Sequence, residues 1–353
     1  MGLAVSLNLI GRGYRALILD RKEPEKGVLP ENSYEYMYVN LLDLDEDLVS
    51  EIAEQEDLEV LMITAGIGRV ADFKYFTTAE INSIMTINAT STIKILRLFY
   101  DRINSDRDFY TGVMGSISGL MSSPMAAVYA ASKASVCRLI ESVNIELEVS
   151  GIANRILNVS PASFKGSGFY GGPNRLELMK DLAENITERI FTRETLYIPQ
   201  YEETFKAVLE RYHADPHEYG IYSYKFKKDS GRVNDRSRMV TGYLSGCFDP
   251  FDIRSLERIK KAKKNCDYLI VGVETDEGAD DGERAVLREQ SRQIVAACKY
   301  VDRAADACAN EAEAWEKWHF GRLFVTAERM KAGWLEQYEA FFADKGVEIV
   351  SIY

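Results

Sequence analysis

The segment from Ser116 to Lys133 contains a hydroxyl, a phenol and an ammonium group, residue types that can move a proton to or from a carbonyl oxygen. Tyr129 and Lys133 are four residues apart, so on a helix they share one face and the ammonium group favours the ionised form of the phenol. Tyr129 is therefore a candidate proton donor or acceptor, and Ser116 would hold a substrate carbonyl or hydroxyl against it. Because Tyr-x-x-x-Lys occurs on many amphipathic helices, this interpretation depends on the surrounding fold.

Two elements must position these groups. Residues 108–116 predict a buried strand ending at Ser116, and residues 126–148 predict the helix that carries Tyr129 and Lys133. Together they resemble the active-site segment of the short-chain dehydrogenase/reductase family, whose serine also precedes its tyrosine by thirteen residues. The resemblance covers about the first half of the chain, since three features before Ser116 also occur in the family's order. They are Asp20 after a strand, Thr64-Ala65-Gly66 after a strand, and Asn88 in a helix.

The resemblance implies a catalytic set of Asn88, Ser116, Tyr129 and Lys133. In this set Tyr129 transfers the proton, Lys133 lowers the pKa of Tyr129 and binds the cofactor ribose, and Ser116 polarises the carbonyl group. Asn88 lies where the helix of the family kinks, and a water molecule links its backbone to the lysine. We therefore expect an NAD(P)-dependent oxidoreductase.

The resemblance also implies contacts along a dinucleotide cofactor. An acid at Asp20 would bind the adenosine ribose hydroxyls and repel a 2′-phosphate, which favours NAD, while Arg21 leaves NADP open. The family's Asn-Asn-Ala-Gly is replaced by Thr64-Ala65-Gly66, which keeps small residues but loses turn-fixing hydrogen bonds, and Ala162 replaces a glycine beside the nicotinamide. The implied cofactor contacts are Gly2, Asp20, Arg21, Asp43, Ala65, Gly66, Tyr129, Lys133, Pro161, Ala162 and Ser163.

The N-terminus departs from the family pattern. The spacing from Gly2 to Asp20 matches that from the last glycine of the family's Gly-rich turn to its ribose-binding acid, so the chain is expected to begin inside this motif. The strand before that turn normally lies between the strands that here end at Asp20 and Gly66, and each would lack one ladder partner. We therefore expect a natural reading frame about a dozen residues longer upstream, and weak or no dinucleotide binding by the 353-residue form.

Composition limits the function classes. The chain is 46% hydrophobic and 28% charged, enough for two moderate cores. A net charge of −12 argues against partners such as nucleic acid or a membrane surface, because phosphate groups would be repelled. No apolar run suits a membrane helix and no signal peptide is recognised, so a cytoplasmic protein is expected. Five scattered cysteines indicate reduced thiols, and the three histidines lack zinc-ligand spacing, so no metal is expected.

The predicted elements describe an α/β protein of two domains. Residues 1–224 predict a Rossmann-like parallel-sheet domain without its first strand, residues 225–238 a polar linker, and residues 239–353 a smaller α/β domain. Residues 165–174 are rich in glycine and serine and predict either a lid over substrate or a plain surface loop.

Residues 246–277 resemble the start of the cytidylyltransferase-like nucleotidyltransferases. That family places two histidines on the nucleotide phosphates, but Asp252 and Ser255 stand at those positions and Arg254 replaces the glycine between them. An aspartate would repel a triphosphate and an arginine would fill its space. Arg292 alone matches a phosphate-contacting arginine of the family, so nucleotidyl transfer is expected to be lost.

Three functions remain open from the sequence. The first is an oxidoreductase acting on a small polyol, keto-sugar or their phosphates in cell-surface polymer synthesis, suggested only by fusion to a domain that resembles enzymes of activated-polyol synthesis. The second is a pseudoenzyme that scaffolds polysaccharide assembly or a homo-oligomer through the helices after Asn88 and after Tyr129. The third is a working cytidylyltransferase, which would need a phosphate-binding group supplied in trans.

Overall fold

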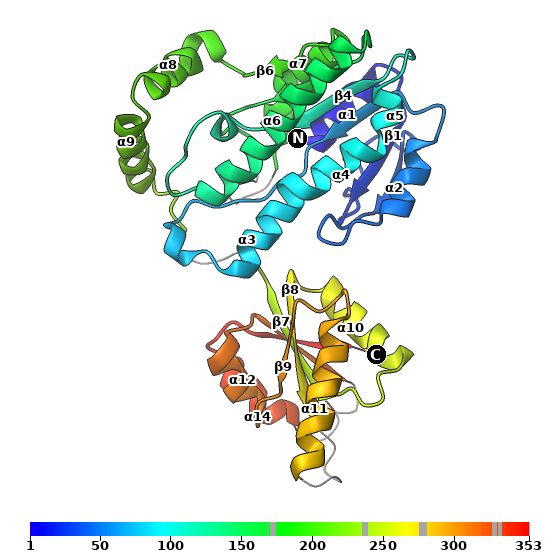
Figure 1. The fold of residues 1–353 in the computed structure, drawn as a ribbon, viewed down its shortest axis with the longest axis vertical. Helices are drawn as coiled ribbons and strands as arrows, with labels where there is room; N and C mark the ends of the chain where they lie inside the picture. Colours follow the sequence, from blue (N-terminus) through cyan, green and yellow to red (C-terminus); the bar gives the residue numbers. More distant parts are fainter. Residues whose placement is uncertain are drawn as a thin grey trace. The chain divides into compact units, whose positions relative to one another are not determined.

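The computed structural model describes residues 1–167, 169, 174–234, 239–274, 281–326, 330 and 334–352. The chain divides into two compact units, Met1–Ser237 and Arg238–Tyr353, which are considered separately (Figure 1). No helix in these described ranges is both long and apolar enough to cross a lipid bilayer. None of the five cysteines, all of which lie in the described ranges, forms a disulfide bond.

The strands of the first unit form two parallel sheets. One sheet pairs β1 with β2, and the other has the order β3-β4-β5-β6. Their bounds are β1 Ala16–Asp20, β2 Tyr34–Tyr38, β3 Val60–Ile63, β4 Tyr110–Met114, β5 Ile156–Val159 and β6 Leu196–Tyr197. Within the described residues no ladder joins β1 to β3, so the two sheets are separate there.

Helices cover both faces of these sheets. Their bounds are α1 Gly2–Gly11, α2 Glu46–Ala53, α3 Thr78–Met85, α4 Ser91–Leu98, α5 Tyr100–Ile103, α6 Ala127–Val149, α7 Lys180–Phe191, α8 Lys206–Ala214 and α9 Pro216–Asp229. On one face, α6 buries Val136, Ile140 and Leu147, which recur at helical spacing, against strands β3 to β5. On the other face, α1 and α7 pack against β4 and β5. This two-sided burial explains why the strand residues are apolar almost without interruption.

The segment after α8 differs from the predicted linker. Asp215 accepts hydrogen bonds from the backbone of His217 and Glu218, and Pro216 occupies the first turn of α9. Asp215 and Pro216 therefore separate α8 from α9. The helix then continues to Asp229, beyond residue 225 where the linker was expected to begin. Val233 next forms a parallel bridge with Val70. The sequence prediction placed this boundary too early, because the polar residues of α9 were interpreted as a loop.

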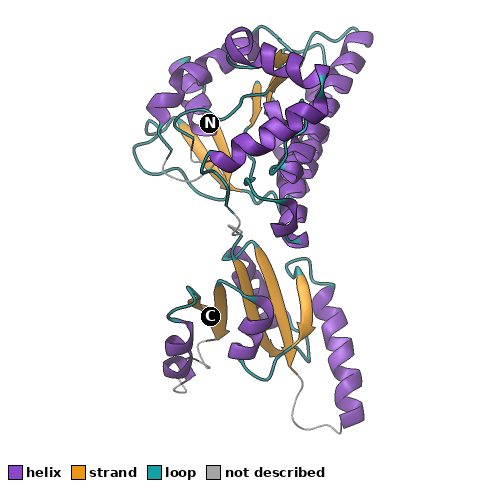
Figure 2. Ribbon diagram, turned by 90° about the vertical axis from the view of Figure 1, so that its left-hand side faces the viewer, coloured by secondary structure: helices purple, strands orange, loops and turns teal. Residues whose placement is uncertain are grey.

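The second unit is a five-stranded parallel sheet in the order β11-β10-β7-β8-β9. The strands are β7 Thr241–Cys247, β8 Tyr268–Glu274, β9 Arg303–Asp306, β10 Arg322–Thr326 and β11 Glu348–Ile352, and the helices are α10 Ile253–Lys264, α11 Asp281–Ala296, α12 Glu311–Trp318 and α14 Trp334–Phe342. Helices flank the sheet in Figure 2: α10 and α11 share one buried cluster with it, and α12 and α14 share another. The α/β architecture predicted for residues 239–353 is confirmed. The likeness of this unit to nucleotidyltransferases stays a prediction.

Candidate active site

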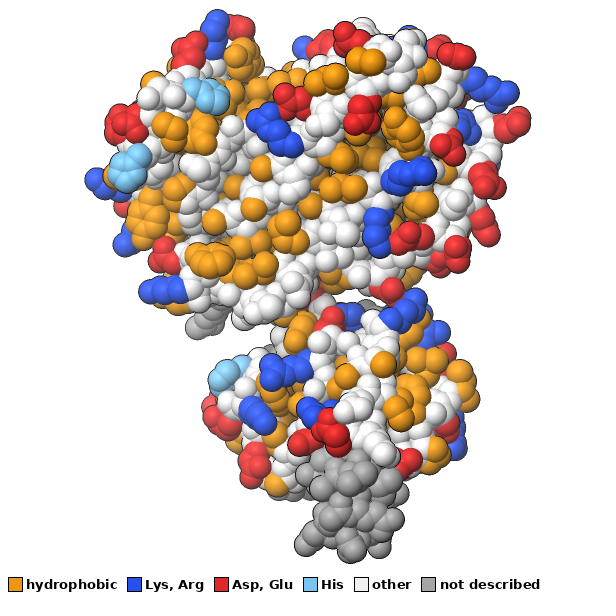
Figure 3. Space-filling model, in the orientation of Figure 1, with side chains coloured by type: hydrophobic (Ala, Val, Ile, Leu, Met, Phe, Trp, Pro, Cys, Tyr) orange, Lys and Arg blue, Asp and Glu red, His pale blue; other side chains and the backbone are white. Residues whose placement is uncertain are grey.

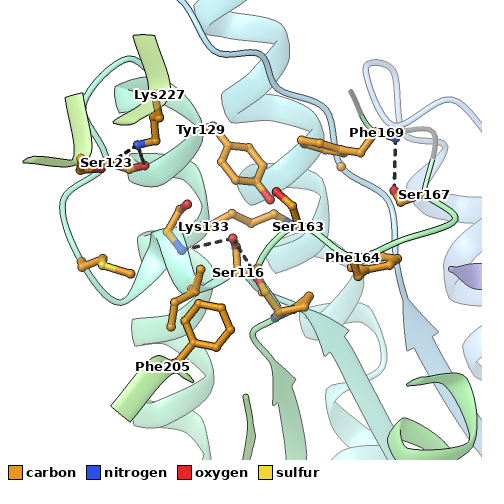
Figure 4. A pocket seen from close by; sticks show the side chains of 18 of the residues that line it. Ser116, Ser123, Tyr129, Lys133, Ser163, Phe164, Ser167, Phe169, Phe205 and Lys227 are labelled. Atoms are coloured by element: carbon orange, nitrogen blue, oxygen red, sulfur yellow. Dashed lines mark hydrogen bonds between the residues drawn. The ribbon is translucent and has the colours of Figure 1, made fainter. Parts of the chain in front are cut away.

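A cavity of about 580 Å³ lies at the carboxyl ends of β4 and β5 (Figure 4). Chain segments that follow parallel strands meet at this edge of a sheet, which is the usual position of ligand sites in α/β folds. Seven residues predicted from the sequence line it: Gly66, Ser116, Tyr129, Lys133, Pro161, Ala162 and Ser163. The structure thus gathers the hydroxyl, phenol and ammonium groups around one space.

Ser116 is fixed immediately after β4. Its backbone is extended, its side chain is buried, and its hydroxyl oxygen accepts a hydrogen bond of 3.2 Å from the backbone of Ser118. The same hydroxyl lies 3.5 Å from the carbonyl oxygen of Pro161, to which it donates. Pro161 follows β5, so this contact ties together the two strand ends that border the cavity.

Lys133 is almost completely buried, with 3% of its surface exposed. Its ammonium group donates a 2.7 Å hydrogen bond to the carbonyl oxygen of Met114 at the end of β4. Burial lowers the pKa of Lys133 to about 8. A β-carbon at Gly66 would lie 3.3 Å from the ammonium nitrogen, so glycine at this position leaves room for the lysine.

The Tyr129 ring packs against backbone rather than against another side chain on one side. A β-carbon at Gly68 would come within 2.6 Å of this ring, so only glycine allows the observed approach. The Phe169 ring lies 5.3 Å from the Tyr129 ring, centroid to centroid. Gly68 was not predicted as a site residue, because a glycine two positions after Gly66 looks like ordinary turn chemistry until the partner ring is known.

Asn88 lies in a π-helical turn, Thr86–Thr90, between α3 and α4. This is the local break in the helix that the family resemblance implies. The side chain is fully buried and makes two hydrogen bonds of 2.8 Å with the backbone of Ile67 and one of 3.0 Å with the hydroxyl of Ser132. Asn88 therefore connects the segment after β3 to the helix that carries Tyr129.

The other residues predicted to contact a cofactor do not line the cavity. Asp20, Arg21, Asp43 and Ala65 are not among the described residues that line the cavity. Asp20 ends β1, is exposed, and accepts a hydrogen bond from the backbone of Lys22. Gly2 lies beside Thr64, since a β-carbon on it would be 2.8 Å from the Thr64 hydroxyl oxygen. Their cofactor contacts stay predictions.

One wall of the cavity was missed by the sequence analysis. It comes from α9, on which Tyr219, Tyr222, Ser223, Phe226 and Lys227 line the cavity at spacings of three and four residues. Hydrophobic side chains gather over α8 and α9 in Figure 3, where Tyr222 and Phe226 are about half exposed. This spacing is the signal that could have identified the wall. Arg232, which was assigned to the linker, also lines the cavity.

The predicted lid, residues 165–174, lies partly outside the described residues. Of its described members, Ser167, Phe169 and Asn174 line the cavity. The backbone of Phe169 donates to the Ser167 hydroxyl at 3.2 Å. The part of this segment that can be described therefore borders the predicted site, while a closing movement stays a prediction.

Asp252 of the second unit is engaged within its own helix. Its carboxylate accepts a 2.8 Å hydrogen bond from the backbone of Ser255 at the start of α10, and Arg254 pairs with it at 2.8 Å. The backbone hydrogen bond and then the Arg254 contact lower the pKa of Asp252 to about 2. A carboxylate thus lies at a helix N-terminus, where it would oppose an incoming phosphate.

Known proteins resemble the first part of this chain. Residues 1–169 match the family model described as short chain dehydrogenase. A very-long-chain 3-oxoacyl-CoA reductase from Emericella nidulans is 25% identical over 165 residues, covering 43% of this chain and 48% of that protein. A 17-beta-hydroxysteroid dehydrogenase type 3 from Rattus norvegicus is 26% identical over 167 residues, covering 44% of this chain and 55% of that protein. The chain spans about half the length of these curated relatives.

Solved structures share its fold. A short chain dehydrogenase/reductase from Burkholderia phymatum, in complex with NAD, has a TM-score of 0.52 at 17% identity, covering 61% of this chain and 89% of that one. A short-chain dehydrogenase from Streptomyces avermitilis has a TM-score of 0.50 at 15% identity, covering 65% of this chain and 94% of that one. Residues 1–169 thus match the short-chain dehydrogenase family model by sequence, and the chain shares the fold of these two solved short-chain dehydrogenases.

Proposed function

We propose that the first unit is an NAD(P)-dependent oxidoreductase that interconverts a carbonyl group and an alcohol. The observation that carries this proposal is the gathering of Ser116, Tyr129 and Lys133 around one cavity at the carboxyl ends of β4 and β5. The match of residues 1–169 to the short-chain dehydrogenase model supports it.

Each side chain has a distinct task in this proposal. In carbonyl reduction, the Ser116 hydroxyl exchanges its 3.5 Å contact with Pro161 for a hydrogen bond donated to the substrate oxygen. The Tyr129 phenol gives that oxygen its proton. The Lys133 ammonium group, held by Met114 in a buried position, stabilises the phenolate that remains. Asn88 positions these groups, because it ties the segment after β3 to α6 through Ile67 and Ser132.

The residues around the cavity fit the nicotinamide end of a dinucleotide. Gly66 leaves backbone open beside the Lys133 ammonium group, and Pro161, Ala162 and Ser163 border the same space. When bound, the nicotinamide supplies or accepts the hydride. The exposed carboxylate of Asp20 at the end of β1 supports NAD as the preferred cofactor, with NADP left open by the adjacent Arg21.

The test replaces the proposed proton donor. Tyr129→Phe should lower turnover of NADH with a panel of aldehydes and ketones at least ~100-fold, because a general acid typically contributes that much. Cofactor affinity, measured by NADH fluorescence at up to millimolar concentration, should stay within about twofold. Tyr201→Phe is the matched control on an exposed tyrosine and should behave as wild type. Equal turnover by Tyr129→Phe and wild type would refute the proposal.

The finer predictions remain attached to this function as proposals. A polyol or keto-sugar substrate, a role in polysaccharide precursor synthesis and a cytoplasmic location rest on the sequence alone. Pairing of two copies through α4 and α6 is supported by the exposed apolar residues Ile145 and Val149 on α6. Charged substitutions of these two residues, followed by size-exclusion chromatography, would test that pairing.

A further inference from the structure

The cavity has an unusual charge for this protein. The chain carries 55 acidic and 43 basic residues, yet none of the described residues that line the cavity is Asp or Glu. Three side-chain cations line it instead: Lys133, Lys227 and Arg232. Lys133 belongs to the proposed catalytic set, so Lys227 and Arg232 supply positive charge that the reduction of a carbonyl group does not require.

Lys227 is built into the wall of the cavity. Its ammonium group donates hydrogen bonds to the Ser123 hydroxyl at 2.6 Å, the Pro124 carbonyl at 2.8 Å and the Ser223 hydroxyl at 3.2 Å (Figure 4). All three acceptors are neutral. Burial and then the neighbouring charge of Arg232 lower the pKa of Lys227 to about 8, as expected for cations that lack a carboxylate partner.

Arg232 is held beside Lys227 by the segment that follows α9. Val233 bridges Val70, and the backbone of Asn234 donates to the Val70 carbonyl at 2.8 Å. The buried Arg69 guanidinium group donates to the Asn234 carbonyl at 2.7 Å while it pairs with Glu80. Within the described residues, no acidic side chain forms an ion pair with Lys227 or Arg232.

Several aromatic side chains also line the cavity. Phe164, Phe169, Phe205, Tyr219 and Phe226 line it, and Figure 4 shows Phe164 and Phe169 on the side of Tyr129 away from Lys227. Such a lining favours an apolar ligand body. The two cations beside this lining would bind a ligand that carries a negative charge more tightly than a neutral one.

We propose that the substrate of this unit is an oxo acid: its carbonyl group lies at Tyr129 and Ser116, an apolar segment lies among the aromatic rings, and a terminal carboxylate or phosphate pairs with Lys227 and Arg232. This proposal rests on the proposed oxidoreductase function for the position of the carbonyl group. The anion site itself rests only on the charges and contacts of the wall. The polyol and keto-sugar substrates predicted from the sequence share the anion only when phosphorylated.

The experiment measures binding without cofactor or turnover. Benzoylpropionate, benzoylbutyrate and benzoylpentanoate are titrated calorimetrically into the full chain beside their methyl esters and the phosphate monoester of a matching hydroxyketone. At least one anion should bind about tenfold more tightly than its ester, because charge-assisted hydrogen bonds are lost in the ester. The carboxylate and phosphate arms distinguish the two kinds of anion.

Variants of the cavity wall test whether these two cations cause the preference for the anion over its ester. Lys227→Met and Arg232→Met should each remove most of this preference, and Lys227→Arg should retain part of it. Lys225→Met, which changes an exposed lysine on the same helix, should leave it unchanged. If Lys227→Met fails to fold, Arg232→Met, which changes an exposed side chain, still tests whether the wall binds the anion. Equal binding of anions and esters, no anion binding by wild type, or an equal loss in Lys225→Met would overturn the proposal.

Two further measurements keep this proposal distinct from the oxidoreductase function. Tyr129→Phe should retain the anion preference. If the wild-type chain shows no turnover but still prefers the anion, the anion site is supported and the oxidoreductase activity is refuted. Lys227→Met should leave NADH affinity within about twofold. A tenfold loss of NADH affinity would assign these cations to the cofactor and overturn the proposal.

Discussion

The Asn88 side chain forms two hydrogen bonds of 2.8 Å with the backbone of Ile67, one donated to its carbonyl and one accepted from its N–H. Asn144 makes the same pair of 2.8 Å bonds with the backbone of Ile156. Both asparagines are buried, but only Asn88 lies against Gly66 beside Lys133. The chain thus contains a matched control for the role of Asn88.

Asn88→Ala and Asn144→Ala should each lower the free energy of unfolding by roughly 2–4 kcal/mol, because each leaves a buried backbone N–H and carbonyl unpaired. Only Asn88→Ala should also lower the turnover of bound substrate, since it frees the segment that borders Lys133. Urea denaturation and steady-state kinetics at a temperature where both variants are folded would check this. A similar loss of turnover in Asn144→Ala would show that stability alone is responsible.

Gly68→Ala should displace the Tyr129 ring, because the new methyl group would lie 2.6 Å from a ring carbon. We expect kcat to fall roughly 10- to 100-fold, as small misplacements of a reacting group commonly do. Gly11→Ala is the control, since a β-carbon there meets nothing within 4 Å. Unchanged kcat in Gly68→Ala would mean that the ring can move without affecting the reaction.

Lys133→Met should separate stability from activity. The pKa of Lys133 is lowered to about 8, below its value in the unfolded chain, so the folded state binds fewer protons between about pH 8 and 10.5. The destabilisation by this buried cation is complete below pH 8, about 3 kcal/mol, and disappears as pH rises through that window. Lys133→Met should therefore be inactive. Its free energy of unfolding should exceed that of wild type at pH 7, after about 1 kcal/mol is subtracted for the lost hydrogen bond to Met114, and the difference should be smaller at pH 10. Denaturation of wild type and variant at both pH values would check this, with Lys225→Met as control. A difference in free energy of unfolding that is the same at pH 7 and pH 10 would contradict it.

Glu80→Gln should weaken the wall that holds Arg232. Arg69 and Glu80 are both almost fully buried, and the change leaves the guanidinium group without its counter-charge, at a cost of roughly 3–5 kcal/mol. Binding of the benzoyl acids should weaken, while binding of their esters should not. Glu46→Gln, which breaks the exposed pair with Lys94, should cost less than about 1 kcal/mol and leave probe binding intact.

The second unit should release no pyrophosphate from CTP and glycerol phosphate above a control without enzyme. The Asp252 carboxylate at the start of α10 is the physical reason, because it repels a phosphate from the helix N-terminus. A phosphate-release assay coupled to pyrophosphatase would measure this. Release that scales with protein concentration would prove the expectation wrong.

The sequence predicted most of the first unit because its elements repeat simple patterns. Mostly apolar residues mark β3 to β5, and the spacing of Val136 and Ile140 marks the buried face of α6. The residues that line the cavity from Gly66 to Ser163 follow these strands, so chain order was sufficient to place them at one edge of the sheet.

The wall formed by α9 could not be placed in this way. Lys227 reaches Ser123 and Pro124 through contacts between distant parts of the chain, and no local pattern encodes such a contact. The same holds for Arg69 and Asn234. Gly68 illustrates a third limit, since its small size matters only in relation to a ring on another element.

The separation of β1 from β3 has a consequence for how the first unit opens. β1 pairs only with β2 among the described strands, whereas β4 is paired along both edges. Backbone amides of β1 should therefore exchange with deuterium through a small local opening, while those of β4 should wait for unfolding of the whole unit. The acid proposed to read the adenosine ribose, Asp20, lies at the end of that weakly held strand. A ligand that binds Asp20 would slow amide hydrogen exchange in β1 far more than in β4. Protection of the β1 amides would therefore report whether the adenosine half of a dinucleotide is bound.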